Sequence, residues 1–184
     1  QMEFPDTYDV VDKVEAQCQA EGIRFYRAKS HMDALESWRK FGPPSRILRW
    51  CCHVHKSVPQ AIKLRQELGG TYTGLDFVGV RAQESIQRSD YEYESYGKKL
   101  KGQYSHNSIL EWTSAEVWLY IYYYNLIINE AYKMGNQRVG CIFCPMSAKT
   151  DYIKNVLYSD HINRFADIVR ESYTQEDIES GYWC

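Results

Sequence analysis

The order of apolar and polar residues along this chain predicts an α/β fold in which helices cover a mainly parallel sheet. Segments with helical spacing alternate with short runs of strand-forming residues, which is the pattern that parallel sheets with helical crossovers produce. The run LDFVGV at 75–80 is apolar apart from one aspartate, as expected of a strand buried on both faces. With 184 residues, 44% of them hydrophobic, the whole chain, 1–184, is expected to form one domain.

Three helices and one further strand are expected in the first part of the chain. Residues 7–20 place apolar side chains at helical spacing among acidic and polar ones, and a second helical stretch covers about 31–40. Between them, IRFYRA at 23–28 is rich in strand formers. A third helix, AIKLRQEL at 61–68, follows Pro59 and ends at a pair of glycines.

The second part of the chain is expected to contain a surface excursion and two helices. Residues 81–104 are polar and lack a clear period. TSAEVWLYIYYYN at 113–125 begins with Thr and Ser and has Glu three residues on, which is typical of a helix N-terminus. Its many aromatic side chains favour core packing over a base-stacking platform. A last helical region covers roughly 150–173.

Charge and hydropathy exclude several classes of function. The 22 basic and 24 acidic side chains give a net charge of −2, so nothing in the overall charge predicts nucleic-acid binding. No apolar run approaches the roughly 20 residues that span a bilayer, and no secretory signal is recognisable. We therefore expect a cytoplasmic protein without a membrane partner. Gln1 is not an initiator residue, so we also expect the chain to belong to a longer reading frame.

Four of the six cysteines form two pairs, the adjacent Cys51 and Cys52 and the Cys141 and Cys144 of CIFC. Without a secretory signal, metal or redox chemistry is favoured over disulfides. Two adjacent thiolates point awkwardly at one zinc ion, whereas a [4Fe-4S] cluster offers each thiolate its own iron. We expect such a cluster, with zinc or buried free cysteines as the alternatives.

Several motifs in order carry a resemblance to a known family. They are CC followed by Lys56 and Pro59, GVRAQESIQR at 79–88, ILEWTSAEVWLYI at 109–121 and NEAYKMGNQRVGCIFC at 129–144. In this order they resemble the adenylylsulfate and phosphoadenylylsulfate (APS and PAPS) reductases of the adenine nucleotide alpha hydrolase superfamily, over nearly the whole chain. The resemblance implies a Rossmann-like fold in which Cys51, Cys52, Cys141 and Cys144 hold a [4Fe-4S] cluster.

The same resemblance implies a nucleotide site in GVRAQESIQR. Arg81 directly follows the predicted buried strand, at the edge where ligands bind to open α/β sheets. Arg81 and Arg88 are expected to clamp phosphate or sulfate through bidentate hydrogen bonds. Glu84 and Ser85 would brace the arginines or touch the ligand, and Lys56 would add positive charge near cluster and substrate. The alternative is a solvated polar loop with two ordinary arginines.

Two parts of the family pattern are absent from the sequence. The Ser-Gly-Gly-x-Asp-Ser type pyrophosphate loop is missing, and MEFPDTYDVV at 2–11 resembles the stretch after the second strand. We expect the N-terminal strand and that loop to lie upstream of Gln1, and this C-terminal portion of the domain to bind nucleotide weakly and to be inactive alone. The nucleophile's Glu-Cys-Gly-x-His segment is also absent. Cys184 in GYWC is the remaining catalytic candidate, without a visible means of lowering its thiol pKa.

The resemblance implies an oxidoreductase with an adenine sulfonucleotide as substrate. A cysteine thiolate would attack the sulfate sulfur, and a thioredoxin-like dithiol would then release sulfite. Two alternatives stay open at this point: a sulfurtransferase or nucleotidyl-transfer relative on the same scaffold, and a zinc-stapled binding module without enzymatic activity. No residue can be assigned to a 3'-phosphate, so APS and PAPS are both candidates.

Overall fold

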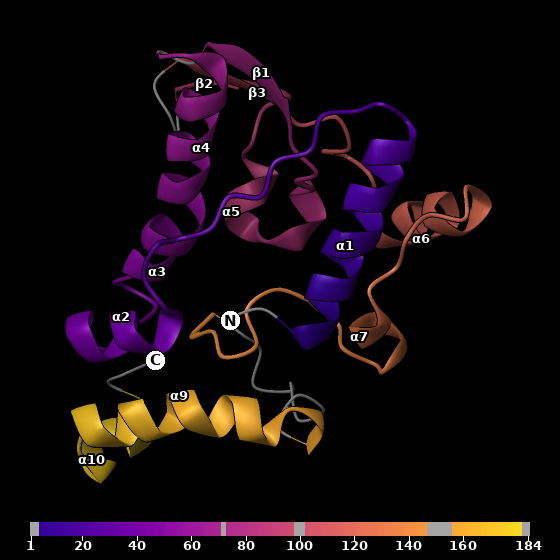
Figure 1. Cartoon of the computed structure of the whole chain (residues 1–184). Helices are drawn as coiled ribbons and strands as arrows, with labels where there is room; N and C mark the ends of the chain where they lie inside the picture. Colours follow the sequence, from indigo (N-terminus) through magenta and orange to yellow (C-terminus); the bar gives the residue numbers. More distant parts are fainter. Residues whose placement is uncertain (1–3, 71–72, 98–101, 147–155, 182–184) are drawn as a thin grey trace. The chain divides into compact units, whose positions relative to one another are not determined.

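The computed structural model describes residues 4–70, 73–97, 102–146 and 156–181 (Figure 1). The chain divides into two compact units. The first unit combines Gln1–Pro59 with Ile128–Cys184, and the second is the intervening segment Gln60–Ile127. The sequence-based expectation of one domain therefore stays a prediction, and each unit is described by itself.

The described part of the first unit consists of helices and connecting loops. Its helical elements are α1 (Pro5–Ala20), α2 (Ala34–Phe41), α3 (Trp50–Cys52), the π-helical turn η1 (His53–Ser57), α7 (Glu130–Lys133), α9 (Ser159–Ser172) and α10 (Gln175–Glu179). Local signals set their starts. Pro5 occupies the first turn of α1, where a missing N–H costs nothing, and the Asp33 carboxylate accepts hydrogen bonds from two backbone N–H groups at the start of α2. The helices predicted at 7–20, 31–40 and 150–173 correspond to α1, α2 and α9, although residues 147–155 lie outside the described ranges.

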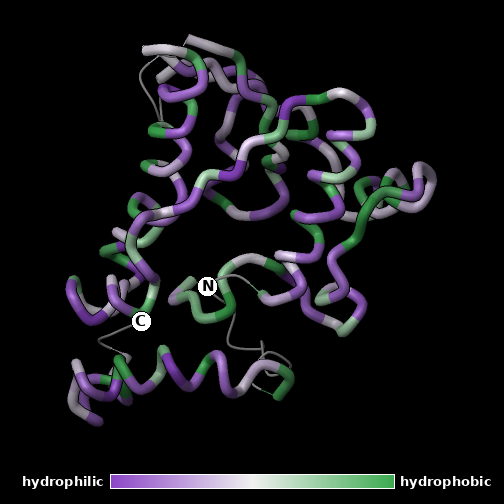
Figure 2. The backbone as a smooth tube through the Cα atoms, viewed as in Figure 1, coloured by the Kyte–Doolittle hydropathy of each residue, from purple (hydrophilic) through white to green (hydrophobic). Residues whose placement is uncertain are grey.

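The main core of the first unit lies between α2 and α9. The Trp38 and Phe165 rings are fully buried, and their centroids lie 4.9 Å apart. Along α9 hydrophobic and hydrophilic residues alternate at helical spacing (Figure 2), and the side chains that α9 buries include Phe165, Ile168 and Val169. This core also includes Cys51, and Cys141 packs against it. A helix pair from distant parts of the sequence thus supports both cysteine motifs.

The strand predicted at 23–28 is wrong. Residues 23–30 have no regular secondary structure, and the three-stranded sheet formed by the described residues does not include them. Strand-forming side chains are not sufficient, because a strand also needs a neighbour that pairs with its backbone. In place of such pairing, the Arg27 side chain of this segment forms ion pairs with Asp12 and Glu15 of α1.

The second unit contains a small mixed sheet and several helices. Its elements are most of α4 (Val58–Leu68), β1 (Gly74–Phe77), η2 (Ala82–Glu84), α5 (Ile86–Ser89), β2 (Glu94–Tyr96), β3 (Gln103–His106) and α6 (Ser114–Tyr123). The strand order is β1-β3-β2, with β1 parallel and β2 antiparallel to β3. The α/β class is confirmed. The segment 81–104, which the sequence predicted to be a long surface excursion, contains two short helical elements, the strand β2 and the start of β3 among its described residues.

The strand β1 is not buried on both faces as the sequence predicted. In the parallel register Gly74 lies opposite Gln103, which is 5% exposed, so this face is covered. The side chains of Leu75 and Phe77 belong to the other face, since successive side chains alternate, and they are 56% and 73% exposed. An apolar run therefore indicated the strand correctly but not its burial.

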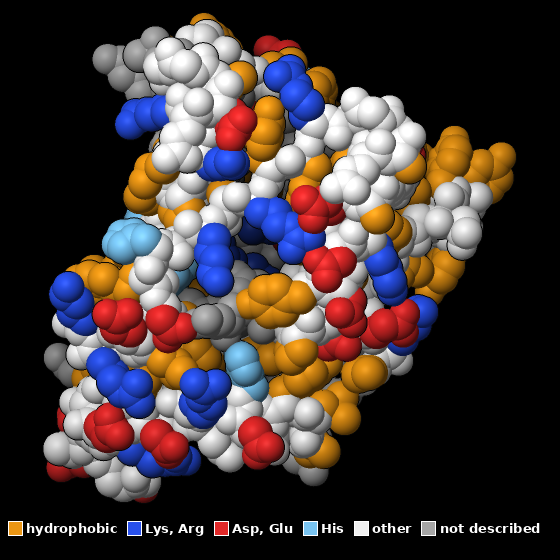
Figure 3. All heavy atoms as spheres, in the orientation of Figure 1, with side chains coloured by type: hydrophobic (Ala, Val, Ile, Leu, Met, Phe, Trp, Pro, Cys, Tyr) orange, Lys and Arg blue, Asp and Glu red, His pale blue; other side chains and the backbone are white. Residues whose placement is uncertain are grey.

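The helix α6 begins as its sequence predicts but does not pack as predicted. Thr113 and Glu116 form a capping box, in which each side chain bonds the other residue's backbone N–H. The aromatic side chains, however, do not enter a core: Tyr122 and Tyr123 are 68% and 82% exposed, and hydrophobic side chains gather over α6 (Figure 3). Apolar residues occupy every side of this helix, and one packing surface covers only part of them. No helix in the described ranges is long and apolar enough to cross a bilayer.

Candidate functional site

The fold of the first unit brings the two cysteine pairs to one core. Cys51, on the short helix α3, is 8% exposed and belongs to the cluster around Trp38. Cys141 packs against the same cluster. Phe143, between the two cysteines of CIFC, lies with its ring centroid 5.7 Å from Trp38. The CIFC loop is therefore held on the surface that carries Cys51, although the two motifs are far apart in the sequence.

The thiol pKa values show how closely the cysteines interact. A hydrogen bond to Cys52 is the main cause that raises the pKa of Cys51, followed by burial. The negative charges of Cys141 and Cys144 raise it further, so both thiols of the second pair lie within electrostatic reach of Cys51. The same hydrogen bond lowers the pKa of Cys52 to about 6, with help from the positive charge of Lys56. The first unit thus gathers four thiols and a lysine.

The donor chemistry of these four thiols fits a soft metal site. Thiolates are the ligands of both iron–sulfur clusters and structural zinc, and in this structure Cys51, Cys52, Cys141 and Cys144 form no disulfide bond. Among the residues that the structure describes, no three His, Cys, Asp or Glu side chains have the arrangement of a metal site. The four thiols are therefore suitable metal ligands that lie near one another, but the described residues do not form a complete coordination shell.

The histidines beside the cysteine pair have different surroundings. His55 Nε2 lies 2.8 Å from the hydroxyl of Ser37, a fully buried residue of α2. His53 is exposed. The π-helical turn after Cys52 adds one residue to a helical turn, a distortion that is frequent at functional sites. Sequence reasoning missed the bond from His55 to Ser37, because nothing in either segment indicates that they meet.

The motif GVRAQESIQR follows β1 in the second unit. The side chain of Arg81 is 17% exposed, and its Nε lies 3.8 Å from a carboxylate oxygen of Glu84. The same carboxylate forms a close ion pair with Arg88. The Ser85 hydroxyl accepts a hydrogen bond from the backbone N–H of Arg88 and so caps α5. Glu84 thus contacts both arginines, whereas the Ser85 side chain caps the helix α5.

Gln83 within this motif and Ser114 outside it form contacts that the sequence did not predict. Arg81 donates a hydrogen bond from Nη1 to the hydroxyl of Ser114, at 3.0 Å. The side-chain oxygen of Gln83 accepts one from the backbone N–H of Ser114, at 2.9 Å. Gln83 lies inside the arginine motif and Ser114 inside the helix-start signature, so each was visible, but only the fold brings them together.

The predicted site residues are distributed over both units. The four cysteines and Lys56 belong to the first unit, and the arginine motif belongs to the second. Cys184 lies outside the described residues.

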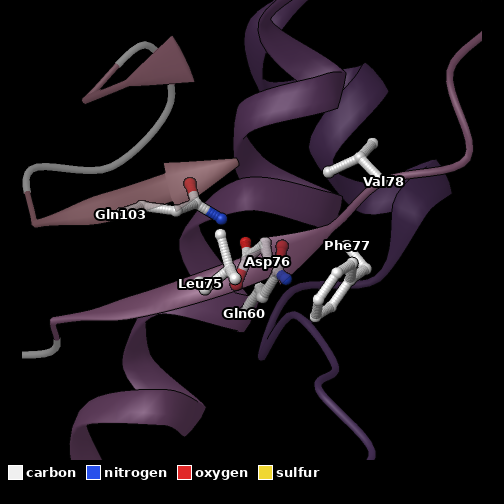
Figure 4. Close-up of a pocket in the computed structure, with 6 residues that line it drawn as sticks. All are labelled: Gln60, Leu75, Asp76, Phe77, Val78 and Gln103. Carbon is white, nitrogen blue, oxygen red and sulfur yellow. The ribbon is translucent and has the colours of Figure 1, made fainter. Parts of the chain in front are cut away.

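A cavity of about 460 Å³ lies within the second unit, at β1. Figure 4 shows its six lining residues on α4, β1 and its C-terminal end, and β3, namely Gln60, Leu75, Asp76, Phe77, Val78 and Gln103. None of the site residues predicted from the sequence lines it. The side-chain oxygen of Gln103 is buried there without a hydrogen-bond partner.

Comparison with known proteins identifies the family. Residues 1–147 match the sequence profile of the phosphoadenosine phosphosulfate reductase domain. The chain belongs to the phosphoadenosine phosphosulfate reductase family. This family is part of the adenine nucleotide alpha hydrolase superfamily, as the motif order indicated. Its members named as reductases are oxidoreductases.

The relatives within this family are distant and longer. An uncharacterised protein of Methanocaldococcus jannaschii is 29% identical over 99% of the chain and 43% of its own length. An adenosine 5'-phosphosulfate reductase of Anoxybacillus flavithermus is 24% identical over 100% of the chain and 65% of its own length. The chain thus spans less than two thirds of the length of either protein.

A solved structure supports the fold. The crystal structure of phosphoadenylyl-sulfate (PAPS) reductase from Candida auris, a phosphate complex, superposes with a TM-score of 0.52 at 24% identity. The match covers 76% of this chain and 64% of that chain. At this identity the likeness concerns the fold, and it agrees with the Rossmann-like α/β class expected from the sequence.

Proposed function

We propose that the protein containing this chain is a sulfonucleotide reductase that converts adenylylsulfate, or its 3'-phosphorylated form, to sulfite with a thiol as reductant. The observation that carries the proposal is the gathering of two distant cysteine pairs around one core beside Lys56. Family membership of the chain supports the same reading. The relatives named as reductases act on this class of substrate, which favours it over another group transfer.

Arg81 and Arg88 would bind the anionic groups of the substrate. A guanidinium presents N–H donors in a planar fork that matches two oxygens of a sulfate or phosphate. Glu84 contacts both arginines, so it keeps two like charges close together. Its single negative charge leaves the three residues with a net positive charge, which suits an anionic ligand.

The proposed reaction has three steps. A cysteine thiolate forms a bond to the sulfate sulfur, and the bond from that sulfur to the phosphate oxygen breaks, so the nucleotide leaves with the electron pair. One thiolate of a thioredoxin-like dithiol then attacks the sulfur of the modified cysteine and displaces sulfite. The second thiol of the reductant resolves the mixed disulfide, so the dithiol is oxidised as sulfate is reduced. Cys184 is the nucleophile candidate that the sequence offers.

Cys51, Cys52, Cys141 and Cys144 would hold a [4Fe-4S] cluster. When bound, the cluster would supply fixed charge without needing to change its own redox state. The fold itself positions the thiols. Phe143 packs CIFC against Trp38, and burial holds Cys51 in the same core. The alternative zinc ion would use the same thiolates.

The first test is sulfite release by the full-length protein, purified without oxygen, from each sulfonucleotide with thioredoxin as reductant. Arg81→Ala is expected to lower kcat/KM about 10- to 100-fold, because a hydrogen bond to a charged group contributes about 1.5–3 kcal/mol. Arg170→Ala is the matched control, since Arg170 is a surface arginine of α9 paired with Asp167. Absence of sulfite from both nucleotides would contradict the proposal.

The second test concerns the metal. Iron and sulfide analysis with a visible absorption spectrum is expected to show a cluster that the Cys51→Ala, Cys144→Ala double variant loses. Stoichiometric zinc in a colourless sample would support a structural metal instead.

A further inference from the structure

We infer that Ser114, held by Gln83, positions the Arg81 guanidinium toward the anionic end of the substrate. The inference rests on the function proposed above, in which Arg81 binds the sulfonucleotide. Neither residue belongs to the substrate-binding set that the sequence predicted. Both act through Arg81, so they are positioning residues.

Arg81 forms a direct hydrogen bond with the first residue of α6. Arg81 Nη1 donates to the Ser114 hydroxyl oxygen at 3.0 Å. Ser114 is the first residue of α6, and the capping box between Thr113 and Glu116 fixes the backbone on either side of it. The partner of Arg81 is therefore a hydroxyl at a rigid helix start, which restricts the arginine more than a mobile surface side chain would.

Gln83 determines which part of the Ser114 hydroxyl faces Arg81. The Gln83 side-chain oxygen lies 3.3 Å from the Ser114 hydroxyl, which donates to it, and 2.9 Å from the Ser114 backbone nitrogen. A serine hydroxyl has one hydrogen to donate and two lone pairs to accept with. With the hydrogen directed at Gln83, a lone pair is left for the guanidinium.

A neutral partner has a specific advantage for an anion-binding arginine. A carboxylate in the place of Ser114 would hold Arg81 equally well but would cancel its charge. Glu84, the acidic residue near Arg81, lies 3.8 Å from its Nε and also pairs with Arg88. Ser114 therefore orients Arg81 while its positive charge stays available to a sulfate or phosphate group.

The arginine loop is joined both to α6 and to the turn that precedes it. The backbone N–H of Ala82 donates to the carbonyl of Leu110 at 2.7 Å, and Gln83 accepts from an N–H at the start of the helix, where such groups lack helical partners. The loop that carries Arg81 is thus anchored by backbone and side chain, and Ser114 extends this anchoring to the guanidinium.

The test compares three variants of the full-length protein. Ser114→Ala removes the acceptor, Ser114→Thr restores a hydroxyl, and Thr174→Ala removes the capping threonine of α10, an equivalent helix cap in the first unit. We measure the Kd of adenylylsulfate by isothermal titration, the midpoint of urea unfolding, and the NMR signal of the Arg81 Nε–H group.

The expected results separate positioning from stability. Ser114→Ala should weaken binding about tenfold, as for the loss of a hydrogen bond to a charged group, with an unchanged urea midpoint and a faster-exchanging Arg81 signal. Ser114→Thr should bind within about twofold of the wild type. Thr174→Ala should lower the urea midpoint and leave Kd unchanged.

Two results would overturn the inference. The first is wild-type affinity of Ser114→Ala while Arg81→Ala loses binding. The second is an Arg81 Nε–H signal that is the same with and without the Ser114 hydroxyl. If Arg81→Ala itself binds normally, the proposed function fails, and the NMR signal alone then decides whether Ser114 positions Arg81.

Discussion

Replacing Phe165 by alanine tests whether the aromatic core holds the cysteine motifs. Phe165 is 2% exposed on α9, and its ring centroid lies 4.9 Å from Trp38 and 6.3 Å from Phe143, one of the two residues between the cysteines of CIFC. Loss of this ring removes these two aromatic contacts and a third with His161, and it leaves a cavity beside the loop. We expect the free energy of unfolding to fall and the CIFC thiols to become more reactive.

The magnitude follows from burial. Replacement of a fully buried phenylalanine by alanine costs about 3–5 kcal/mol, which is a large share of the roughly 5–15 kcal/mol that stabilises a typical domain. With an unfolding slope of about 2 kcal/mol per molar urea, the midpoint should fall by roughly 2 M. Phe77→Ala is the matched control, since Phe77 is 73% exposed. Its cost should stay below about 1 kcal/mol.

The assay is urea unfolding followed by tryptophan fluorescence, with thiol titration of the metal-free protein in parallel. Trp38 lies in the core in question and reports its opening. Equal and small losses for Phe165→Ala and Phe77→Ala would refute the reasoning. So would a destabilised Phe165→Ala protein whose cysteines react no faster than those of the wild type.

Three predictions concern titration. In metal-free protein, alkylation of Cys52 should rise with a midpoint near pH 6, because the hydrogen bond from its neighbour lowers its pKa to about 6; a midpoint near 9 would contradict this. Hydrogen bonds from Thr113 lower the pKa of Glu116, so its stabilising contribution is present above its ordinary pKa and is lost as pH falls through the folded pKa. Glu116→Gln should abolish that part of the pH dependence in urea midpoints; an unchanged profile would count against the capping box. Burial, followed by the bond to Asp6, raises the pKa of Tyr158 to about 12 from 10.0. Tyr158→Phe should therefore cost about 1 kcal/mol below pH 10, and the wild type should lose this advantage between pH 10 and 12; a constant difference would refute it.

Local signals in the sequence predicted the helices well. The helical spacing at 7–20 and the Thr-Ser-x-Glu signature before α6 both act within a few residues of the elements they specify. The same holds for the choice of four cysteines, since their spacing is a property of the chain. These features could be recognised from the sequence because their physical causes are local.

Predictions of burial and pairing succeeded less well. The segment 23–28 contains strand formers but pairs with no described strand, and β1 and α6 expose apolar side chains that were expected to be buried. In each case the local composition was read correctly. Pairing and burial depend on which surface, if any, lies opposite, and composition does not contain that information.

Motif order, periodicity and capping residues lie along the chain itself, and they were enough to predict the family, the helices and the candidate ligands. Three contacts could be seen only in the folded chain: CIFC packs on the core that contains Cys51, His55 meets Ser37, and Ser114 meets Arg81. The physical reason is distance along the chain. Contacts between remote segments form only where the packing of the elements brings their side chains within hydrogen-bonding or van der Waals range.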